Sequence, residues 1–231
     1  MDPRQRLIVA LDVSTAAAAR KIVAAVGDSA FTYKVGMQLY TAEGPAIVRE
    51  VVGSSRKVFL DLKYHDIPNT VGAAVREAAQ LGASMLSVHA AGGGKMLRAA
   101  VQAAQAAKPN LLVLAVTVLT SLDDVELGKL GLRGGVLDQV LRLAALALSN
   151  GCKGVVASAL EAAALREEFG HDFAIVTPGV RPAGSGPNDQ ARVVTPAEAI
   201  AAGASHIVVG RPITDASDPA AEARAILGQI G

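Results

Sequence analysis

Eight short apolar segments alternate along the chain with Ala-rich stretches. Most are continuously apolar and are bounded by Gly, Pro or polar residues. Continuous apolar strands are typical of parallel sheets that are covered on both faces, whereas half-exposed strands alternate apolar and polar positions. The expected strands are RLIVALD (6–12), TYKVG (32–36), KVFLDLK (57–63), MLSVHA (85–90), LLVLAVTVL (111–119), GVVAS (154–158), FAIVTPG (173–179) and HIVVG (206–210).

The stretches between these segments predict helices, for example TAAAARKIVAAV, NTVGAAVREAAQLG and GGVLDQVLRLAALALSNG, and Gly82, Gly151 and Gly203 stand where C-cap glycines are expected. Eight β–α units in 231 residues match a (β/α)₈ barrel. An open doubly wound sheet is the alternative, but it more often has a Gly-rich motif after its first strand. No linker or composition break appears, so residues 1–231 are expected to form a single barrel domain.

The composition narrows the class of protein. Hydrophobic residues make up 51% of the chain and charged residues 19%, which allows a large core, and the net charge of +1 gives no indication of nucleic-acid binding. The single cysteine, Cys152, excludes a disulfide within the chain and fits a reducing compartment. The start of the chain lacks a signal-peptide pattern and the apolar runs are too short for a membrane span, so we expect a cytoplasmic protein.

Most expected strands have candidate site residues near or just beyond their ends, and a barrel carries its active site at the carboxyl ends of its strands. The candidates in chain order are Asp12, Lys34, Asp61, Lys63, Asp66, His89, Thr117, Thr120, Ser121, Pro178, Arg181, Gly210 and Arg211.

Asp61 and Lys63 are two positions apart in one expected strand, so their side chains share a face and lie roughly 7 Å apart along it. Lys34 ends the preceding strand and can join them. With Asp66, the four groups form a charge-balanced array in which each group can stay ionised. A structural ion-pair network is the alternative, but four charges at adjacent strand ends on this face favour chemistry.

A second signal lies after the last two strands, where barrels commonly bind phosphate. Gly210 lets a ligand approach the backbone, and Arg211 can bind a phosphate with its forked guanidinium. The long Gly- and Pro-rich loop 180–196 is expected to act as a lid that brings Arg181 and Gln190 to the ligand. A surface arginine and a variable surface loop are the alternatives.

A metal site is a further alternative, because His65 follows the expected third strand and His89 lies near the end of the expected fourth, both near Asp61. No H-x-D pair occurs at the second strand, however, and Lys34 occupies that region. A cation beside a divalent metal ion is unfavourable, so we expect these histidines to lie at the rim without a metal.

Six motifs carry most of these candidate residues: LDV (11–13), YKVG (33–36), FLDLKYHDIPNT (59–70), TVLTS (117–121), TPGVRP (177–182) and VVGRPIT (208–214). Together they resemble the orotidine 5′-phosphate decarboxylase family, in the order of the family and over nearly the whole chain. The most specific part is the D-x-K-x-x-D-I-P-N-T pattern with the lysine upstream.

The resemblance implies decarboxylation of orotidine 5′-phosphate to UMP, the last step of de novo pyrimidine nucleotide synthesis, by a homodimer without metal or organic cofactor. Lys34, Asp61, Lys63 and Asp66 would form the charged array, with Lys63 as the proton donor. Asp66 and Thr70 would reach into the site of the partner subunit. The expected substrate contacts are Asp12 at the ribose, Thr120 and Ser121 over the pyrimidine, and Arg181, Gln190, Gly210 and Arg211 at the phosphate. Lys34, Asp61, Thr70 and Pro178 are further expected substrate contacts.

Two other functions are alternatives to this decarboxylase activity. Hexulose-phosphate synthases and related sugar-acid phosphate decarboxylases share D-x-K-x-x-D, but they use Mg²⁺ and carry Glu where this chain has Lys34. A non-catalytic barrel that senses a nucleotide phosphate is the other rival. The complete charged array speaks against it, because a pure binder has no need of a buried proton donor.

Overall fold

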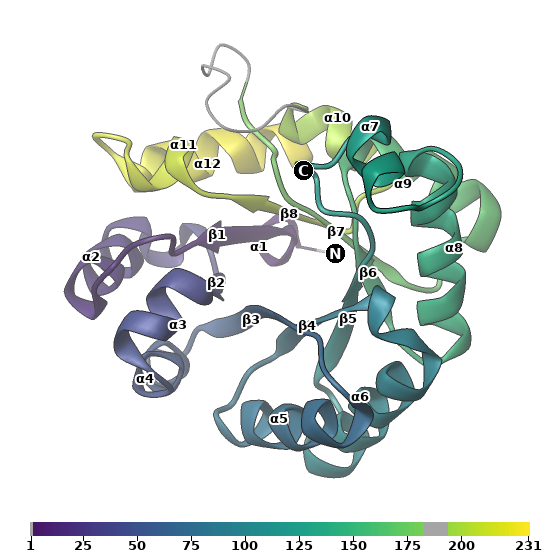
Figure 1. Cartoon of the computed structure of the whole chain (residues 1–231). Coiled ribbons are helices and arrows are strands. Elements are labelled where there is room, and N and C mark those ends of the chain that lie inside the picture. The colour runs from purple at the N-terminus through teal and green to yellow at the C-terminus, as the bar shows by residue number, and fades with distance from the viewer. Residues whose placement is uncertain (1, 183–193) are drawn as a thin grey trace.

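The computed structural model describes residues 2–182 and 194–231. Within these residues, eight parallel strands close into a barrel in chain order, and β1 pairs with both β2 and β8 (Figure 1). The expected (β/α)₈ barrel is therefore confirmed. The strands are β1 Leu7–Ala10, β2 Thr32–Gly36, β3 Lys57–Tyr64, β4 Met85–His89, β5 Leu112–Val116, β6 Gly154–Val156, β7 Ala174–Thr177 and β8 His206–Val209.

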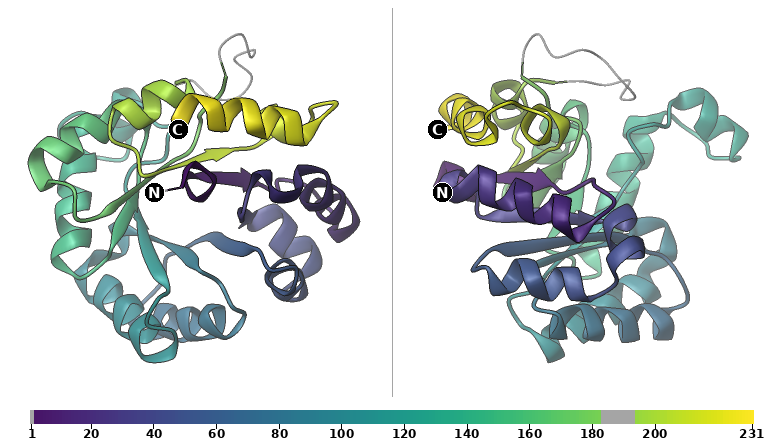
Figure 2. Two further views of the ribbon diagram at one scale, coloured as in Figure 1. Left: turned by 180° about the vertical axis from the view of Figure 1, so that it is seen from behind. Right: turned by 90° about the vertical axis from the view of Figure 1, so that its left-hand side faces the viewer.

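Helices follow the strands and wrap the outside of the barrel, as the two views of Figure 2 show. Thr15 caps α2, and Gly82, Gly151 and Gly203 have the positive φ angles expected of residues that end helices. The helices are α1 Pro3–Arg6, α2 Ala16–Val26, α3 Met37–Glu43, α4 Ala46–Gly53, α5 Pro68–Gln80, α6 Gly93–Ala107, α7 Asp124–Lys129, α8 Val136–Ser149, α9 Ala159–Phe169, α10 Pro196–Ala201, α11 Arg211–Thr214 and α12 Pro219–Ile230, with short 3₁₀ turns at Gly27–Ser29 and Ala90–Gly92.

The apolar side chains form two layers, as the continuous apolar strands require. The larger layer lies between the strands and the helices and includes Leu60 and, at its edge, Leu62. The smaller layer fills the barrel interior and includes Phe59, whose ring is almost fully buried. Because successive strand residues face opposite sides, Asp61 and Lys63 continue the inward row of Phe59 toward the carboxyl end of β3.

Strand β3 is irregular where it reaches the carboxyl end of the barrel. Leu60 pairs with Leu86 of β4, but Tyr64 pairs with Val88, so four steps along β3 correspond to two along β4. Within this interval Lys63 has a φ of 51°, in the left-handed region that residues other than Gly, Asn and Asp rarely adopt. The local backbone of β3 thus departs from the regular strand that the apolar pattern predicts.

None of the helices in the described ranges is long and apolar enough to cross a membrane.

Candidate active site

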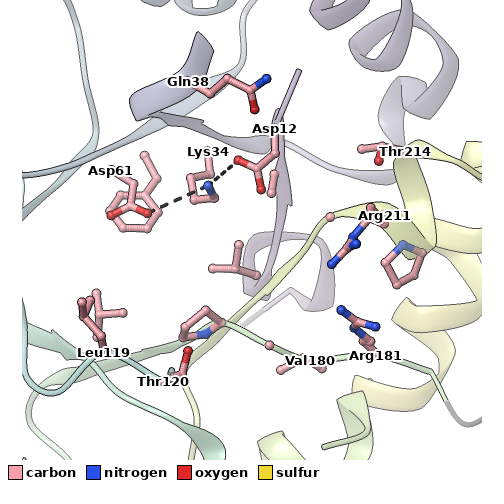
Figure 3. A pocket seen from close by; sticks show the side chains of 18 of the residues that line it. Asp12, Lys34, Gln38, Asp61, Leu119, Thr120, Val180, Arg181, Arg211 and Thr214 are labelled. Carbon is pink, nitrogen blue, oxygen red and sulfur yellow. Dashed lines mark hydrogen bonds and ion pairs between the residues drawn. The ribbon is translucent and has the colours of Figure 1, made fainter. Parts of the chain in front are cut away.

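A cavity of about 670 Å³ opens at the carboxyl ends of the strands. Its floor is apolar and consists of side chains from the barrel interior, including Phe59, Val116 and Val208. Its walls carry the polar and charged residues that follow the strands, which converge on the cavity from several elements (Figure 3). The cavity therefore combines an apolar base with charged walls.

The charged array begins on the wall formed by β1, β2 and β3. Lys34 Nζ lies 2.7 Å from Asp12 Oδ1 and 3.9 Å from Asp61 Oδ2, and Lys63 Nζ lies 2.9 Å from the same Asp61 oxygen. The side chains of Asp61 and Lys34 are only 11% and 13% exposed. Asp12, Lys34, Asp61 and Lys63 alternate in sign, so each charge in this partly buried site has an opposite charge beside it. The fourth member expected from the sequence, Asp66, does not line the cavity within this chain.

Ser87 on β4 is hydrogen-bonded to two residues of this array. It was not predicted from the sequence as a site residue. Its hydroxyl donates to Asp61 Oδ1 at 2.8 Å and accepts from the backbone N–H of Lys63 at 2.9 Å. The side chain is fully buried. The available signal was a lone small polar residue within the otherwise apolar segment MLSV.

Two arginines lie on another side of the same cavity. Arg181 follows β7 and is 5% exposed, whereas Arg211 is the first residue of α11 and is exposed. Figure 3 shows their guanidinium groups facing the same space, with Gly210 of the cavity lining immediately before Arg211. Two guanidinium groups beside a glycine in the cavity lining suit a phosphate dianion. The two ends of the segment that carries Arg181 are bridged at Val180 and Val194.

The remaining predicted site residues fall into three groups. Thr120 and Pro178 line the cavity, as expected. Asp66, Thr70 and Ser121 are exposed and do not line it within this chain. Asp66 Oδ1 accepts the backbone N–H of Ile67 at 2.6 Å. Gln190, and with it most of the expected lid, lies outside the described residues.

Gln38 is a second cavity residue that was not singled out from the sequence. It lies on α3, near Asp12 and Lys34 (Figure 3). An amide on the wall beside a carboxylate and an ammonium adds a neutral hydrogen-bonding group to that part of the cavity. Its position in the helix after YKVG gave no distinguishing signal.

The two candidate histidines stack on one another instead of converging on the cavity. The ring centroids of His65 and His89 are 5.1 Å apart with an interplanar angle of 18°, and His89 Nδ1 accepts from the backbone of Ala91. Burial lowers the pKa of His89, and the nearby charges of His65 and Lys63 lower it further. Within residues 2–182 and 194–231, no group of three or more His, Cys, Asp or Glu side chains has the arrangement of a metal site.

The fold and the cavity define the class of protein: a (β/α)₈ barrel whose strand ends combine an alternating charged array with two guanidinium groups at one cavity. A family model described as "Orotidine 5'-phosphate decarboxylase / HUMPS family" matches residues 5–226. The chain belongs to this family.

Individual relatives agree with the family match. The chain is 54% identical to an orotidine 5'-phosphate decarboxylase of Anaeromyxobacter sp. (strain K), over 98% of both chains. It is 53% identical to that of Halorhodospira halophila, over 97% of this chain and 95% of the relative. Among solved structures, orotidine 5'-phosphate decarboxylase from Lactobacillus acidophilus superposes with a TM-score of 0.88 at 41% identity, covering 98% of this chain and 99% of the other.

Proposed function

We propose that the chain decarboxylates orotidine 5′-phosphate to UMP and CO₂, the closing step of pyrimidine nucleotide synthesis. The observation that carries the proposal is the pairing of two features in one cavity: the array of Lys34, Asp61 and Lys63, and the guanidinium groups of Arg181 and Arg211. A ligand with a phosphate at one end and an acidic ring at the other matches both. The family match supports the same substrate.

The chemistry follows from the position of the Lys63 ammonium. The bond between C6 and the carboxylate breaks, CO₂ leaves, and the electron pair stays on C6. This carbanion lacks an ordinary electron sink, so a fixed cation beside it is the main source of stabilisation. Lys63 then transfers a proton from Nζ to C6, which gives UMP, and regains a proton from solvent.

The other groups prepare the substrate for this step. Asp61, held between Lys34 and Lys63, orients both ammonium groups and lies close to the departing carboxylate, where like charge disfavours the bound substrate relative to the transition state. Asp12 and Thr120, which line the cavity, bind the ribose and cover the pyrimidine ring, respectively. Ser121, expected beside Thr120, is exposed and does not line the cavity in this chain. Binding of the distant phosphate supplies free energy that is used at the ring.

The Mg²⁺-dependent reactions of the same family are the principal alternative. They require an anionic or neutral oxygen ligand in the region where Lys34 places an ammonium, 2.7 Å from Asp12 and 3.9 Å from Asp61. This ammonium already pairs with both carboxylates, and it would repel a divalent cation placed between them. The position of Lys34 therefore favours the decarboxylation of orotidine 5′-phosphate.

We also propose that each active site is shared between two subunits of a homodimer. Asp66 and Thr70 are exposed in the single chain, and Ile67 between them is 66% exposed. An exposed carboxylate next to a large exposed apolar side chain suits a subunit interface. In the dimer, Asp66 and Thr70 of one subunit join Lys63 of the other.

Incubation of the purified chain with orotidine 5′-phosphate tests the proposed activity. We expect the ultraviolet absorbance of orotidine 5′-phosphate to fall while UMP and CO₂ appear in equal amounts. The chain is assayed in parallel with a 3-keto sugar-acid phosphate and Mg²⁺, the type of substrate that the alternative requires. Turnover of the sugar-acid phosphate without turnover of the nucleotide would refute the proposal.

A further inference from the structure

Ser87 closes a ring of hydrogen bonds through the two central residues of the charged array. Lys63 Nζ donates to Asp61 Oδ2 at 2.9 Å, Ser87 Oγ donates to Asp61 Oδ1 at 2.8 Å, and the Lys63 backbone N–H donates to Ser87 Oγ at 2.9 Å. One hydroxyl therefore contacts both the carboxylate and the main chain of the residue that carries the ammonium.

The irregularity of β3 explains why a side chain is needed here. Between Leu60 and Tyr64 the ladder with β4 is interrupted, and the Lys63 N–H bonds to the hydroxyl of Ser87, where a regular strand would use a carbonyl of its neighbour. The left-handed φ of Lys63 is uncommon for a lysine and persists only where the surroundings determine it. Ser87 lies opposite this interval, fully buried, and supplies that constraint.

We propose that Ser87 is a positioning residue for the reaction: it holds Asp61 and the backbone of Lys63 so that the Lys63 ammonium is aimed at C6. The proposal rests on the proposed decarboxylation. Because Ser87 occupies Asp61 Oδ1, the carboxylate is prevented from rotating, and Oδ2 stays directed at Lys34 and Lys63. The hydroxyl is neutral, so its bonds persist when Lys63 has given up its proton.

The variant Ser87→Ala removes both bonds and leaves the volume almost unchanged. Ser205→Ala is the matched control, because Ser205 Oγ also accepts the backbone N–H of a neighbouring strand, from Ile175 at 3.1 Å, and contacts a charged side chain, Arg166 at 3.0 Å. Ser205 does not line the active-site cavity. Each substitution thus deletes two hydrogen bonds of a serine hydroxyl, one with a backbone N–H and one with a charged side chain. Ser87 lies inside the proposed machinery and Ser205 outside it.

Two readouts separate positioning from folding. We expect Ser87→Ala to lower kcat by roughly 10²-fold with KM within about threefold of wild type, since a small misplacement of a reacting group has an effect of this size. Binding of a UMP analogue with an anionic oxygen at C6 is expected to weaken by a similar factor, while binding of UMP itself hardly changes. Ser205→Ala is expected to leave all these quantities near wild type.

Three other results would overturn the proposal, and each identifies a different reason. If the wild type turns over and Ser87→Ala keeps its kcat within about threefold, Ser87 does not position the array. If Ser87→Ala loses the affinity for UMP and for the analogue equally, the residue supports the fold alone. If the wild type itself does not convert orotidine 5′-phosphate, the proposed function fails and the role of Ser87 fails with it.

Discussion

The side chains of Lys63 and Asp61 meet at 2.9 Å across a stretch of β3 in which Lys63 has a φ of 51°. The contact is therefore made within an irregular stretch of backbone. A regular strand would also place both side chains on one face, with their Cα atoms roughly 7 Å apart. In the irregular segment both residues line the cavity and their charged atoms are in contact.

The variant Arg211→Ala removes the proposed phosphate-binding guanidinium. We expect it to lower kcat/KM for orotidine 5′-phosphate by roughly 10²-fold, or about 3 kcal/mol of transition-state binding, because a charge-assisted contact is lost. Orotidine without the phosphate is expected to react equally slowly with both proteins. Steady-state kinetics with the two substrates measures the difference.

Arg20→Ala is the control for this substitution, because Arg20 is an exposed arginine on α2 that pairs with Glu50 and does not line the active-site cavity. It is expected to leave both reactions unchanged. If Arg211→Ala impairs the two substrates by the same factor, Arg211 has a structural role and the assignment of the phosphate subsite is wrong.

The shared active site predicts recovery of activity from two inactive variants. Lys63→Ala and Asp66→Asn are each expected to be nearly inactive, and in a mixed dimer one site carries both changes while the other carries neither. With random exchange of equal amounts, half of the dimers are mixed and half of their sites are intact, so about a quarter of the wild-type activity returns. Rates before and after mixing give the result. Proven subunit exchange without recovery would place Asp66 in its own barrel.

Chelation is expected to have no effect on turnover, because an ammonium group, Lys34, occupies the wall where the Mg²⁺-dependent members of the family need an anionic ligand. The measurement compares the rate in EDTA with the rate after added Mg²⁺. Loss of activity on chelation and its return with Mg²⁺ would contradict the metal-independent mechanism.

His206 on β8 is expected to make the stability depend on pH. Burial, with smaller contributions from the charges of Arg6 and Lys57, lowers the pKa of His206 to about 4, and its Nδ1 has no hydrogen-bond partner in the described structure. The unfolded chain has the ordinary value of 6.5, so it binds more protons than the folded chain between pH 6.5 and 4. The free energy of unfolding therefore falls by roughly 3 kcal/mol through this window as the pH decreases.

The variant His206→Leu is expected to flatten that dependence, with His171→Leu as the control because His171 is exposed. Denaturant unfolding at pH 6.5 and pH 4.5 measures both variants against wild type. Carboxylates that titrate in the same range affect all three proteins alike, so the difference between the variants isolates His206. Equal slopes for His206→Leu and wild type would show that this buried imidazole does not titrate as expected.

The barrel could be predicted from the sequence because each of its β–α units is specified by a local pattern of residues. Continuous apolar runs and Ala-rich helices identify each β–α unit, and TYKVG matches β2 at both ends. The expected segment KVFLDLK fell one residue short of β3, which continues to Tyr64. The prediction that residues 1–231 form one domain, and that the protein is cytoplasmic, stays a prediction.

The site was only partly predictable. The alternation of strand residues placed Asp61 and Lys63 at the cavity, but the register shift of β3 against β4 depends on two segments more than twenty residues apart. The contacts of Ser87 and the place of Gln38 on the cavity wall likewise depend on pairing between distant segments. The partner-subunit role of Asp66 rests on the family resemblance and awaits the mixing experiment.

The central claim is that the Lys63 ammonium drives decarboxylation of orotidine 5′-phosphate. The most direct test is the rate of UMP formation at saturating substrate, measured for wild type, Lys63→Met and the control Lys57→Met. Lys57 is the exposed first residue of the same strand. We expect rapid turnover by wild type and Lys57→Met, and a fall of roughly 10³-fold or more for Lys63→Met, which still binds UMP. No turnover by wild type, or a Lys63→Met rate within about tenfold of it, would contradict the claim.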